Sequence, residues 1–190
     1  IEAGRVYVDK TDLMWEAQQL SKYIFLSRPR RFGKSLLSST FASFFRAEKH
    51  LFEGLKVMEL EKEWIEYPVI HLDLSMAKGE KTVNSLRGRL RWLLRHEVEK
   101  WGVKESIESP GALFTDVIDQ AYRQSGKQVV VIIDEYDAPL LEVLHEDETL
   151  ADKREVMQEF YQTLKASEAM IRFCFITGIT KFSQLSIFST

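Results

Sequence analysis

Four short apolar runs along the chain have the length and composition of β-strands. The first spans Tyr23–Ser27, and the others span residues 69–74, 129–133 and 172–177. The last three runs are rich in β-branched and aromatic side chains, which favour extended backbone. Helical spacing of apolar residues follows each of the first three runs and also precedes the fourth. The pattern therefore predicts strands and helices in alternation.

The segments between the runs place apolar side chains on one face of a helix, at intervals of three and four residues. Pro110 is suited to the first turn of the third of these helices, and Gly126 to the turn that follows it. The expected inner faces are, in chain order, Leu37, Phe41, Phe44 and Phe45; Leu86, Leu90, Leu93, Leu94, Val98 and Trp101; Leu113, Val117 and Ala121; Val156, Phe160 and Leu164.

Alternating strands and helices predict an α/β fold, a three-layer sandwich around a mainly parallel sheet. With 190 residues, of which 45% are hydrophobic, the chain can bury one sizeable core but is short for two, so we expect one domain over residues 1–190. The chain starts at Ile1 rather than Met and stops directly after a strongly patterned segment. We therefore expect a piece of a longer protein, with the end of the fold and any effector domain beyond Thr190.

Composition limits the expected cellular compartment and the expected classes of binding partner. The formal charge of −3 gives no overall attraction to nucleic acid or anionic membrane. A single cysteine excludes an intrachain disulfide and fits a reducing compartment. No apolar run approaches the ~18 residues of a membrane span, and the first ten residues lack a signal-peptide pattern. We expect a cytoplasmic protein without a membrane partner.

A basic segment that ends in Gly33-Lys34-Ser35 joins the first strand to the first helix of the alternation. Free N–H groups at a helix start favour phosphate, a lysine can reach the β- and γ-phosphates, and a serine hydroxyl can ligate Mg²⁺. The usual phosphate-loop pattern has glycine where this chain has Arg28. On three residues alone, an accidental Gly-Lys-Ser in a basic turn explains the segment equally well.

An acidic motif at the end of the third strand favours the phosphate-loop interpretation. The run of residues 129–133 is continuously apolar, so its strand should be buried on both faces, and Asp134 and Glu135 follow it directly. In an ATPase with a phosphate loop, the first acid holds the Mg²⁺ shell and the second acts as general base on water. The alternative is that both acids cap the next turn. Adjacent acids of this kind favour hydrolysis over phosphoryl transfer to a second substrate.

These motifs resemble those of the AAA-ATPase-like family of prokaryotic proteins, which are often joined to a C-terminal PD-(D/E)XK-type nuclease domain. The resemblance covers nearly the whole chain and is least diagnostic in residues 74–125. The segments that carry it are Tyr7-Val8-Asp9-Lys10-Thr11, Arg28-Pro29-Arg30-Arg31-Phe32-Gly33-Lys34-Ser35, Ile133-Asp134-Glu135-Tyr136-Asp137, Thr177-Gly178-Ile179-Thr180-Lys181-Phe182-Ser183 and Ser186-Ile187-Phe188-Ser189.

The resemblance implies a P-loop fold with the additional strand arrangement of ATPases that use a catalytic glutamate. It implies ATP and Mg²⁺ as cofactors, Glu135 as base, Thr177 as a polar sensor of the γ-phosphate, and Ser35 and Asp134 as metal ligands. It also places arginines where other phosphate loops have small residues. The residues assigned to nucleotide binding are Arg28, Arg30, Arg31, Phe32, Gly33, Lys34, Ser35 and Leu36.

Several residues near these motifs have two interpretations. Tyr7 and Asp9 either meet the adenine or ribose or only pack. Asp73, at the end of the second strand, either joins the network around the attacking water or caps the turn before Ser75, and the cap is favoured. Cys174, in an apolar strand, is expected to be a buried structural thiol.

A line of arginines and the scattered histidines are further candidate sites. Arg87, Arg91 and Arg95 recur every four residues, so they contact nucleic acid or form a solvated helix face; nearby acids favour the solvated face. The histidines lack metal-ligand spacing, so no structural metal is predicted.

The leading hypothesis is an ATPase whose Mg²⁺-dependent hydrolysis changes the conformation of an effector domain outside this chain. The alternative is a regulatory or interaction module that binds nucleotide without turnover. Neither the oligomeric state nor the effector follows from the sequence.

Overall fold

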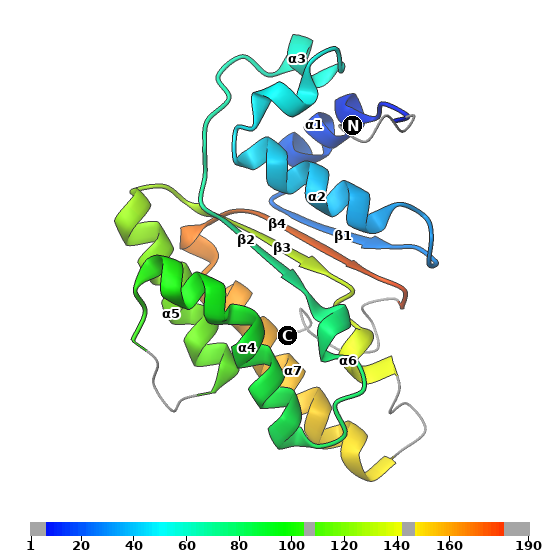
Figure 1. The fold of residues 1–190 in the computed structure, drawn as a ribbon, viewed down its shortest axis with the longest axis vertical. Helices are drawn as coiled ribbons and strands as arrows, with labels where there is room; N and C mark the ends of the chain where they lie inside the picture. Colours follow the sequence, from blue (N-terminus) through cyan, green and yellow to red (C-terminus); the bar gives the residue numbers. More distant parts are fainter. Residues whose placement is uncertain (1–6, 105–108, 142–146, 181–190) are drawn as a thin grey trace.

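The chain folds around a sheet of four parallel strands in the order β1-β4-β3-β2 (Figure 1). A computed structural model describes residues 7–104, 109–141 and 147–180, without the side chains of 147–149. The strands and longer elements are α1 (Thr11–Leu20), β1 (Tyr23–Ser27), α2 (Lys34–Phe45), α3 (Val57–Leu60), β2 (Val69–Asp73), α4 (Val83–Trp101), α5 (Pro110–Ser125), β3 (Val129–Asp134), α6 (Ala138–Leu141), α7 (Asp147–Ala166) and β4 (Ile171–Gly178). Three short 3₁₀ turns cover Lys49–Phe52, Leu74–Ala77 and Glu168–Met170.

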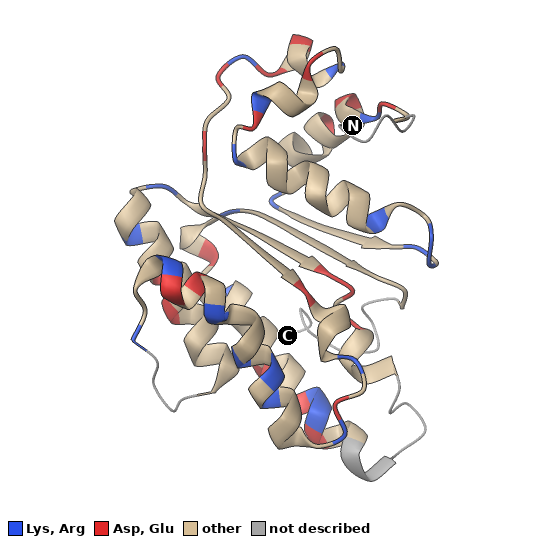
Figure 2. Cartoon of the chain, viewed as in Figure 1, with Lys and Arg blue, Asp and Glu red and all other residues tan. Residues whose placement is uncertain are grey.

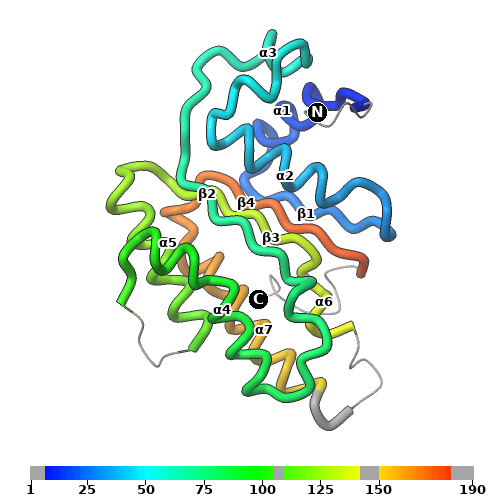
Figure 3. Tube along the Cα trace, in the orientation of Figure 1, coloured from blue at the N-terminus to red at the C-terminus, as the bar shows by residue number. Residues whose placement is uncertain are grey.

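Strand β4 lies between β1 and β3, although it comes last along the described chain. Figure 3 shows the consequence in its colours, with the blue β1 beside the red-orange β4. The register pairs Ser27 of β1 with Gly178 of β4, and Asp73 of β2 with Asp134 of β3. Since all strands are parallel, their carboxyl ends meet at one edge of the sheet, where α/β proteins place their sites.

Helices cover both faces of the sheet, which gives the predicted three layers (Figure 1). On the face under α1 and α2, the ring of Phe41 lies 5.0 Å from that of Phe173 and 4.7 Å from that of Phe175. On the other face, α4, α5 and α7 pack against alternate strand residues such as Val131 and Ile133. Every residue of β3 is buried, as its continuous apolar run predicts.

The four predicted strands agree with the structure to within one residue at each end. β2 ends at Asp73 rather than at residue 74, and β4 is one residue longer at both ends than expected. Pro110 begins α5, and Gly126 follows it with φ of 65°. Helix α1 is not predicted by the apolar pattern, because two of its three buried residues, Thr11 and Gln18, are polar and leave no apolar stripe.

The environment of Cys174 agrees with the sequence prediction. Cys174 is fully buried, and burial raises the pKa of its thiol to about 12, so it is a structural thiol as expected.

On α4, the guanidinium of Arg95 lies 3.8 Å from the ring centre of Trp92, at the exposed surface. Within the described part of the chain, every helix is too short or too polar to span a membrane.

Lys153 on α7 is a charged residue of the core. Its side chain is fully buried, and its Nζ has no hydrogen-bond partner among the described residues. Glu80 interacts with this ammonium through charge alone: its carboxylate is hydrogen-bonded to Arg89 at 2.9 Å, and Arg89 and, to a smaller extent, Lys153 lower its pKa. A buried ammonium without a hydrogen bond lowers the stability of a fold.

We expect Lys153→Met to raise the free energy of unfolding by about 1–3 kcal/mol, because methionine nearly keeps the length of the side chain and removes a buried ammonium without a hydrogen bond among the described residues. Urea unfolding followed by circular dichroism measures the change. Lys165→Met, at an exposed position of the same helix, is the control and should change stability by less than ~0.5 kcal/mol. A less stable Lys153→Met variant would show that the ammonium makes a stabilising contact.

Candidate functional site

Opposite charges gather where the strands end. Figure 2 shows basic residues in the loop between β1 and α2, and acidic residues after β2 and β3, at the same edge of the sheet. The basic loop begins at Arg28, whose N–H donates to the Gly178 carbonyl at 3.1 Å, and Ser27 Oγ donates to the Ile179 carbonyl at 2.9 Å. The loop is therefore fixed to the end of β4.

Two residues give this loop its turn. Arg31 has φ of 67° and Gly33 has φ of 74°, in the left-handed region that costs a non-glycine residue energy. Gly33 precedes the first helical residue of α2, and its carbonyl accepts from the Leu37 N–H at 3.0 Å. Arg28, where the usual pattern has glycine, is not left-handed, which explains why a side chain is tolerated there.

The ammonium of Lys34 lies inside the loop. The side chain is only 5% exposed, and Nζ donates to the carbonyls of Arg28 at 3.0 Å and Pro29 at 3.1 Å. The next residue, Ser35, is exposed. The helix start, with free N–H groups and the positive end of its dipole, adds to the positive potential around this lysine.

Arg28, Arg30 and Arg31 of the same loop are exposed cations. None of them forms an ion pair or a side-chain hydrogen bond with another described residue. Phe32 and Leu36, predicted with them, are also exposed, at 68% and 57%. The loop thus combines uncompensated positive charge with accessible apolar side chains, which suits an anion that carries an apolar group.

The carboxylate of Asp134 ends β3 and is 4% exposed. Its Oδ1 accepts hydrogen bonds from the Thr177 hydroxyl and from the Glu135 N–H at 3.2 Å. Its Oδ2 accepts none from the described residues. One oxygen of this buried acid is therefore held in place and the other is free to bind.

Glu135 is held in an uncommon backbone conformation, with φ of 51°. Its N–H also lies 3.3 Å from the Thr177 hydroxyl, and the next N–H, of Tyr136, donates to the Thr177 carbonyl at 2.8 Å. The Glu135 carboxylate is half-exposed and makes no hydrogen bond with described residues. Left-handed non-glycine residues cluster at functional sites, where surrounding contacts maintain the strain.

Asp137 is a site residue to which the sequence analysis gave no role beyond its place in the motif. It is 2% exposed, and its Oδ2 accepts from the Ile179 N–H at 3.0 Å, the Thr180 N–H at 2.7 Å and the Thr180 hydroxyl at 2.7 Å. The hydroxyl of Tyr136 contacts Thr180 Oγ1 at 3.1 Å. These contacts bind the acidic loop to the segment after β4.

Burial favours the neutral forms of two side chains near the acidic loop, Tyr136 and His71. Burial raises the pKa of the Tyr136 hydroxyl, although the hydrogen bond with Thr180 opposes that shift. Burial also lowers the pKa of His71 on β2, while the charge of Asp134 works in the opposite direction. His71 is therefore uncharged near pH 7.

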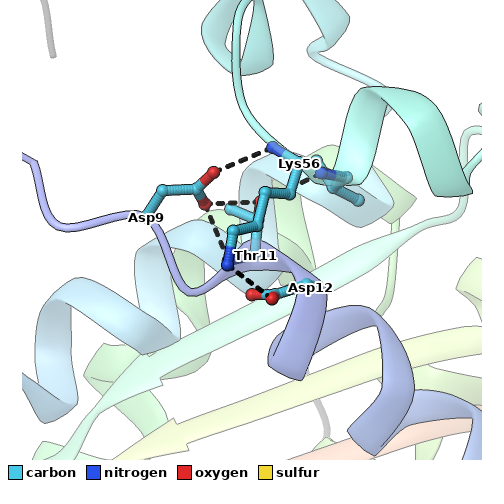
Figure 4. Close-up of polar contacts among 5 residues, drawn as sticks. Asp9, Thr11, Asp12 and Lys56 are labelled. Atoms are coloured by element: carbon cyan, nitrogen blue, oxygen red, sulfur yellow. Dashed lines mark hydrogen bonds and ion pairs between the residues drawn. The ribbon is translucent and has the colours of Figure 1, made fainter.

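Two further predictions are resolved by hydrogen bonds. Asp73 is a cap, because its Oδ1 accepts from the Ser75 N–H at 2.9 Å. Asp9 holds the start of α1 to α3: one carboxylate oxygen accepts from the Thr11 N–H and hydroxyl, and the other from the Lys56 N–H (Figure 4). Lys56 also pairs with Asp12 at 2.6 Å. Asp9 therefore has the packing role that the sequence left open.

The described residues contain no cluster of three or more His, Cys, Asp or Glu side chains placed to hold a metal. They do fit a cation that takes few protein ligands. Mg²⁺ commonly binds one or two protein oxygens together with phosphates and water. The free Oδ2 of Asp134 and the exposed Ser35 hydroxyl are oxygen donors of that kind.

The structure thus gathers the loop of residues 28–33, Lys34, Asp134, Glu135 and Thr177 at one edge of the sheet. The predicted motif segments after Thr180 lie outside the described residues. Sequence reasoning missed the role of Asp137, whose only signal was its position three residues after Asp134 in the acidic motif.

Comparisons with known proteins agree with this picture. A family model described as AAA-ATPase-like, predicted AAA-ATPase, matches residues 1–188. A protein of Azotobacter chroococcum mcd 1, described as an uncharacterized protein in the vnfD 5′ region, is 35% identical over 184 residues. That match covers 96% of this chain and 35% of the relative, so the chain spans about a third of the relative's length. No solved structure matches the chain significantly.

The contact between the acidic loop and β4 leaves no room for a side chain at position 178. A Cβ on Gly178 would lie 2.3 Å from two ring carbons of Tyr136 and 2.9 Å from Oδ1 of Asp137. We expect Gly178→Ala to lower the free energy of unfolding by about 1–3 kcal/mol, because the buried ring must move. Thermal and urea unfolding measure the effect.

Gly88→Ala provides the same substitution at an exposed position of α4, where a Cβ meets no atom within 4 Å. Alanine favours a helix over glycine, so this control should be stabilised by up to ~1 kcal/mol. Equal stability of Gly178→Ala and the wild type would contradict the close approach of Tyr136 to β4.

Proposed function

The chain belongs to the AAA-ATPase-like family, and on that basis we propose that it binds ATP with Mg²⁺ and hydrolyses it. One observation carries the proposal: a basic loop at a helix start and a buried acidic strand end lie at the same sheet edge, and both are hydrogen-bonded to the end of β4. The position of β4 between the basic-loop strand and the acidic strand supports the arrangement expected of ATPases with a catalytic glutamate.

Binding of the triphosphate is the first step proposed. Lys34 Nζ exchanges its two carbonyl acceptors for phosphate oxygens, which are stronger acceptors because they are charged. The first N–H groups of α2 add donors. The three exposed arginines of the loop have no acidic partner among the described residues, so they are available to the same phosphates.

Ser35 and Asp134 would hold Mg²⁺ between them, as the free oxygens of both side chains allow. A bound Mg²⁺ would neutralise charge on the phosphate oxygens. The buried position of Asp134 keeps its carboxylate oriented, since Thr177 and the Glu135 N–H both engage Oδ1. The hydrogen bonds to Oδ1 would then fix the direction of Oδ2, which is the Asp134 oxygen proposed to bind the metal.

Glu135 would accept the proton of the attacking water. Its carboxylate makes no competing hydrogen bond with described residues, and its strained backbone is fixed through Thr177. Thr177 contacts both acids of the motif and pairs in register with Leu26 of β1, two residues before the basic loop. This position supports its assignment as the residue that senses the γ-phosphate.

Loss of the γ-phosphate would change the contacts of Thr177, and this structural change would pass to Ile179 and Thr180 at the end of β4. Thr177 bonds to the acidic loop through both main chain and side chain, and Asp137 binds Ile179 and Thr180 of the same segment. We propose that the part of the protein that responds to this change lies outside this chain, since the relative has about three times the length of this chain. A module that binds ATP without turnover is the alternative.

Replacement of Lys34 tests the phosphate site. We expect Lys34→Ala to weaken binding of ATP with Mg²⁺ by at least ~100-fold, because it removes the buried cation of the loop; isothermal titration calorimetry measures the affinity. Lys127→Ala is the control, because Lys127 also donates to a main-chain carbonyl, that of Glu66, but far from the loop. Unchanged affinity in Lys34→Ala would reject the phosphate loop.

Replacement of Glu135 separates turnover from binding. Glu135→Gln should leave the ATP dissociation constant within about threefold and lower the rate of phosphate release by about 10²–10⁴-fold, the usual contribution of a general base. Asp73→Asn is the control, because Asp73 lies at the same sheet edge but serves as a cap. If wild type and Glu135→Gln bind ATP equally and neither releases phosphate, the module without turnover is the correct alternative.

A further inference from the structure

Helix α4 and the turn before it carry an excess of positive charge that the rest of the chain does not share. Residues 78–96 contain six lysine and arginine residues and one acidic residue, Glu80, so their formal charge is +5. The whole chain has a charge of −3, which leaves −8 for all other residues. Figure 2 shows basic positions along α4. A separation of charge on this scale indicates a surface for an anionic partner.

The basic side chains lie on the side of α4 that faces solvent. The opposite side is fixed in the core by three fully buried leucines, spaced four residues apart. Arg87 and Arg95 are exposed, and neither forms an ion pair with another described residue. Their positions are eight residues apart, which corresponds to about 12 Å along a helix. The helix thus presents uncompensated charge over two turns.

The acids that favour a solvated face in the sequence do not neutralise these arginines. Glu97 is only 8% exposed, and its carboxylate accepts from the Trp101 indole N–H at 3.0 Å and lies 3.9 Å from the Lys100 ammonium. Glu99 is exposed four residues after Arg95, but it forms no ion pair within the described part of the chain. The positive charge of this face is therefore available to a partner.

The one acid of the basic segment is shared between two cations. Glu80 accepts a hydrogen bond from Arg89 at 2.9 Å, and this bond is the main reason that its pKa is lowered. The buried ammonium of Lys153 on α7 lowers the same pKa to a smaller extent. A single carboxylate leaves part of this charge uncompensated, and Lys153 adds to the positive potential behind the helix surface.

A planar aromatic group lies among these cations. Trp92 is 37% exposed, and the guanidinium groups of Arg95 and Arg89 lie 3.8 Å and 5.2 Å from its ring centre. At 3.8 Å the Arg95 guanidinium lies against the indole, which holds a flexible cation at the surface. Because Arg95 is exposed, its other side is open to a further planar group. The bases of nucleic acids stack on aromatic rings and on guanidinium planes alike.

The composition of this face favours unpaired nucleic acid over an anionic membrane. A helix that binds at a bilayer surface buries an apolar face in the lipid. The apolar side of α4 is already buried in the core, and Trp92 is the one large apolar side chain that this fully described helix exposes. In a duplex the bases are already stacked on one another, so planar side chains at the protein surface favour a single strand.

We propose that the exposed face of α4 binds single-stranded nucleic acid, with Arg87 on a phosphate and an unpaired base stacked against Arg95 and Trp92. An arginine fork donates two parallel N–H groups to a phosphate. Contacts to phosphates and to base faces carry little sequence information, so binding should tolerate any base sequence. The proposal goes beyond ATP binding and does not depend on it.

The test is fluorescence anisotropy of a labelled oligothymidylate of about 20 nucleotides, titrated without ATP over about 50–200 mM salt. The wild type is compared with the double variant Arg87→Gln, Arg95→Gln, whose positions are exposed and outside the proposed ATP site. The matched control is Arg123→Gln, Lys165→Gln, which removes two exposed positive charges from α5 and α7. Circular dichroism and gel filtration check that each variant is folded and keeps its oligomeric state.

We expect the wild type to bind the oligonucleotide with an affinity that falls as salt is raised. The double variant of α4 should lose about tenfold or more in affinity, and its slope of log affinity against log salt should be shallower by about 1.4, since each phosphate contact of a single strand contributes about 0.7. The control should match the wild type within about twofold. Trp92→Leu removes stacking but no charge, so it should weaken binding by about fivefold or more and keep the slope.

Four results would overturn the proposal. The first is a folded wild type that does not bind the oligonucleotide, whatever its affinity for ATP. The second is an equal loss in the α4 variant and the control, which would show attraction to any surface charge. The third is binding that Arg30→Gln, Arg31→Gln abolishes and the α4 variant keeps, which would place the strand on the basic loop. The fourth is binding to phosphatidylserine vesicles, lost in the α4 variant, without binding to the oligonucleotide.

Discussion

The pairing of β4 between β1 and β3 is the constraint on which the rest of the site depends. It brings Thr177 beside the end of β1 on one side and beside Asp134 on the other. A carboxylate at the end of a fully buried strand would be unfavourable alone, and the Thr177 hydroxyl and the Glu135 N–H supply the hydrogen bonds that it needs. The acidic chemistry of the edge therefore exists only because strands distant in sequence are paired.

Most of the fold was predictable because its signals are strong and local. β3 is an unbroken apolar run, which predicts a buried strand. α5 has a proline at its start and a glycine after its end, so its terminal residues and the helical spacing of its apolar residues predict the same helix. Helix α1 was missed for a physical reason: Gln18 is buried but polar, and its side chain bonds with Arg172 of β4. A tertiary contact of this kind leaves no trace in the hydrophobic pattern.

The site was predictable only in part. Lys34 and Asp134 stand in short motifs whose chemistry can be argued from residue types. The contact of Tyr136 with Gly178 and the three bonds to Asp137 Oδ2 join residues about forty positions apart, and no local pattern encodes them. Nor does sequence indicate that Phe32 and Leu36 are left uncovered, because exposure depends on what the rest of the chain does not bury.

The two hydrogen bonds from Lys34 to the loop carbonyls have a consequence for selectivity. They connect the loop to the start of α2 without a ligand. If the loop binds phosphates as proposed, an incoming anion would have to replace two main-chain acceptors of the same ammonium. A monovalent ion would gain little from that exchange, whereas a polyanion could contact the helix start and the arginines at once. The proposed site would then select anions by their charge.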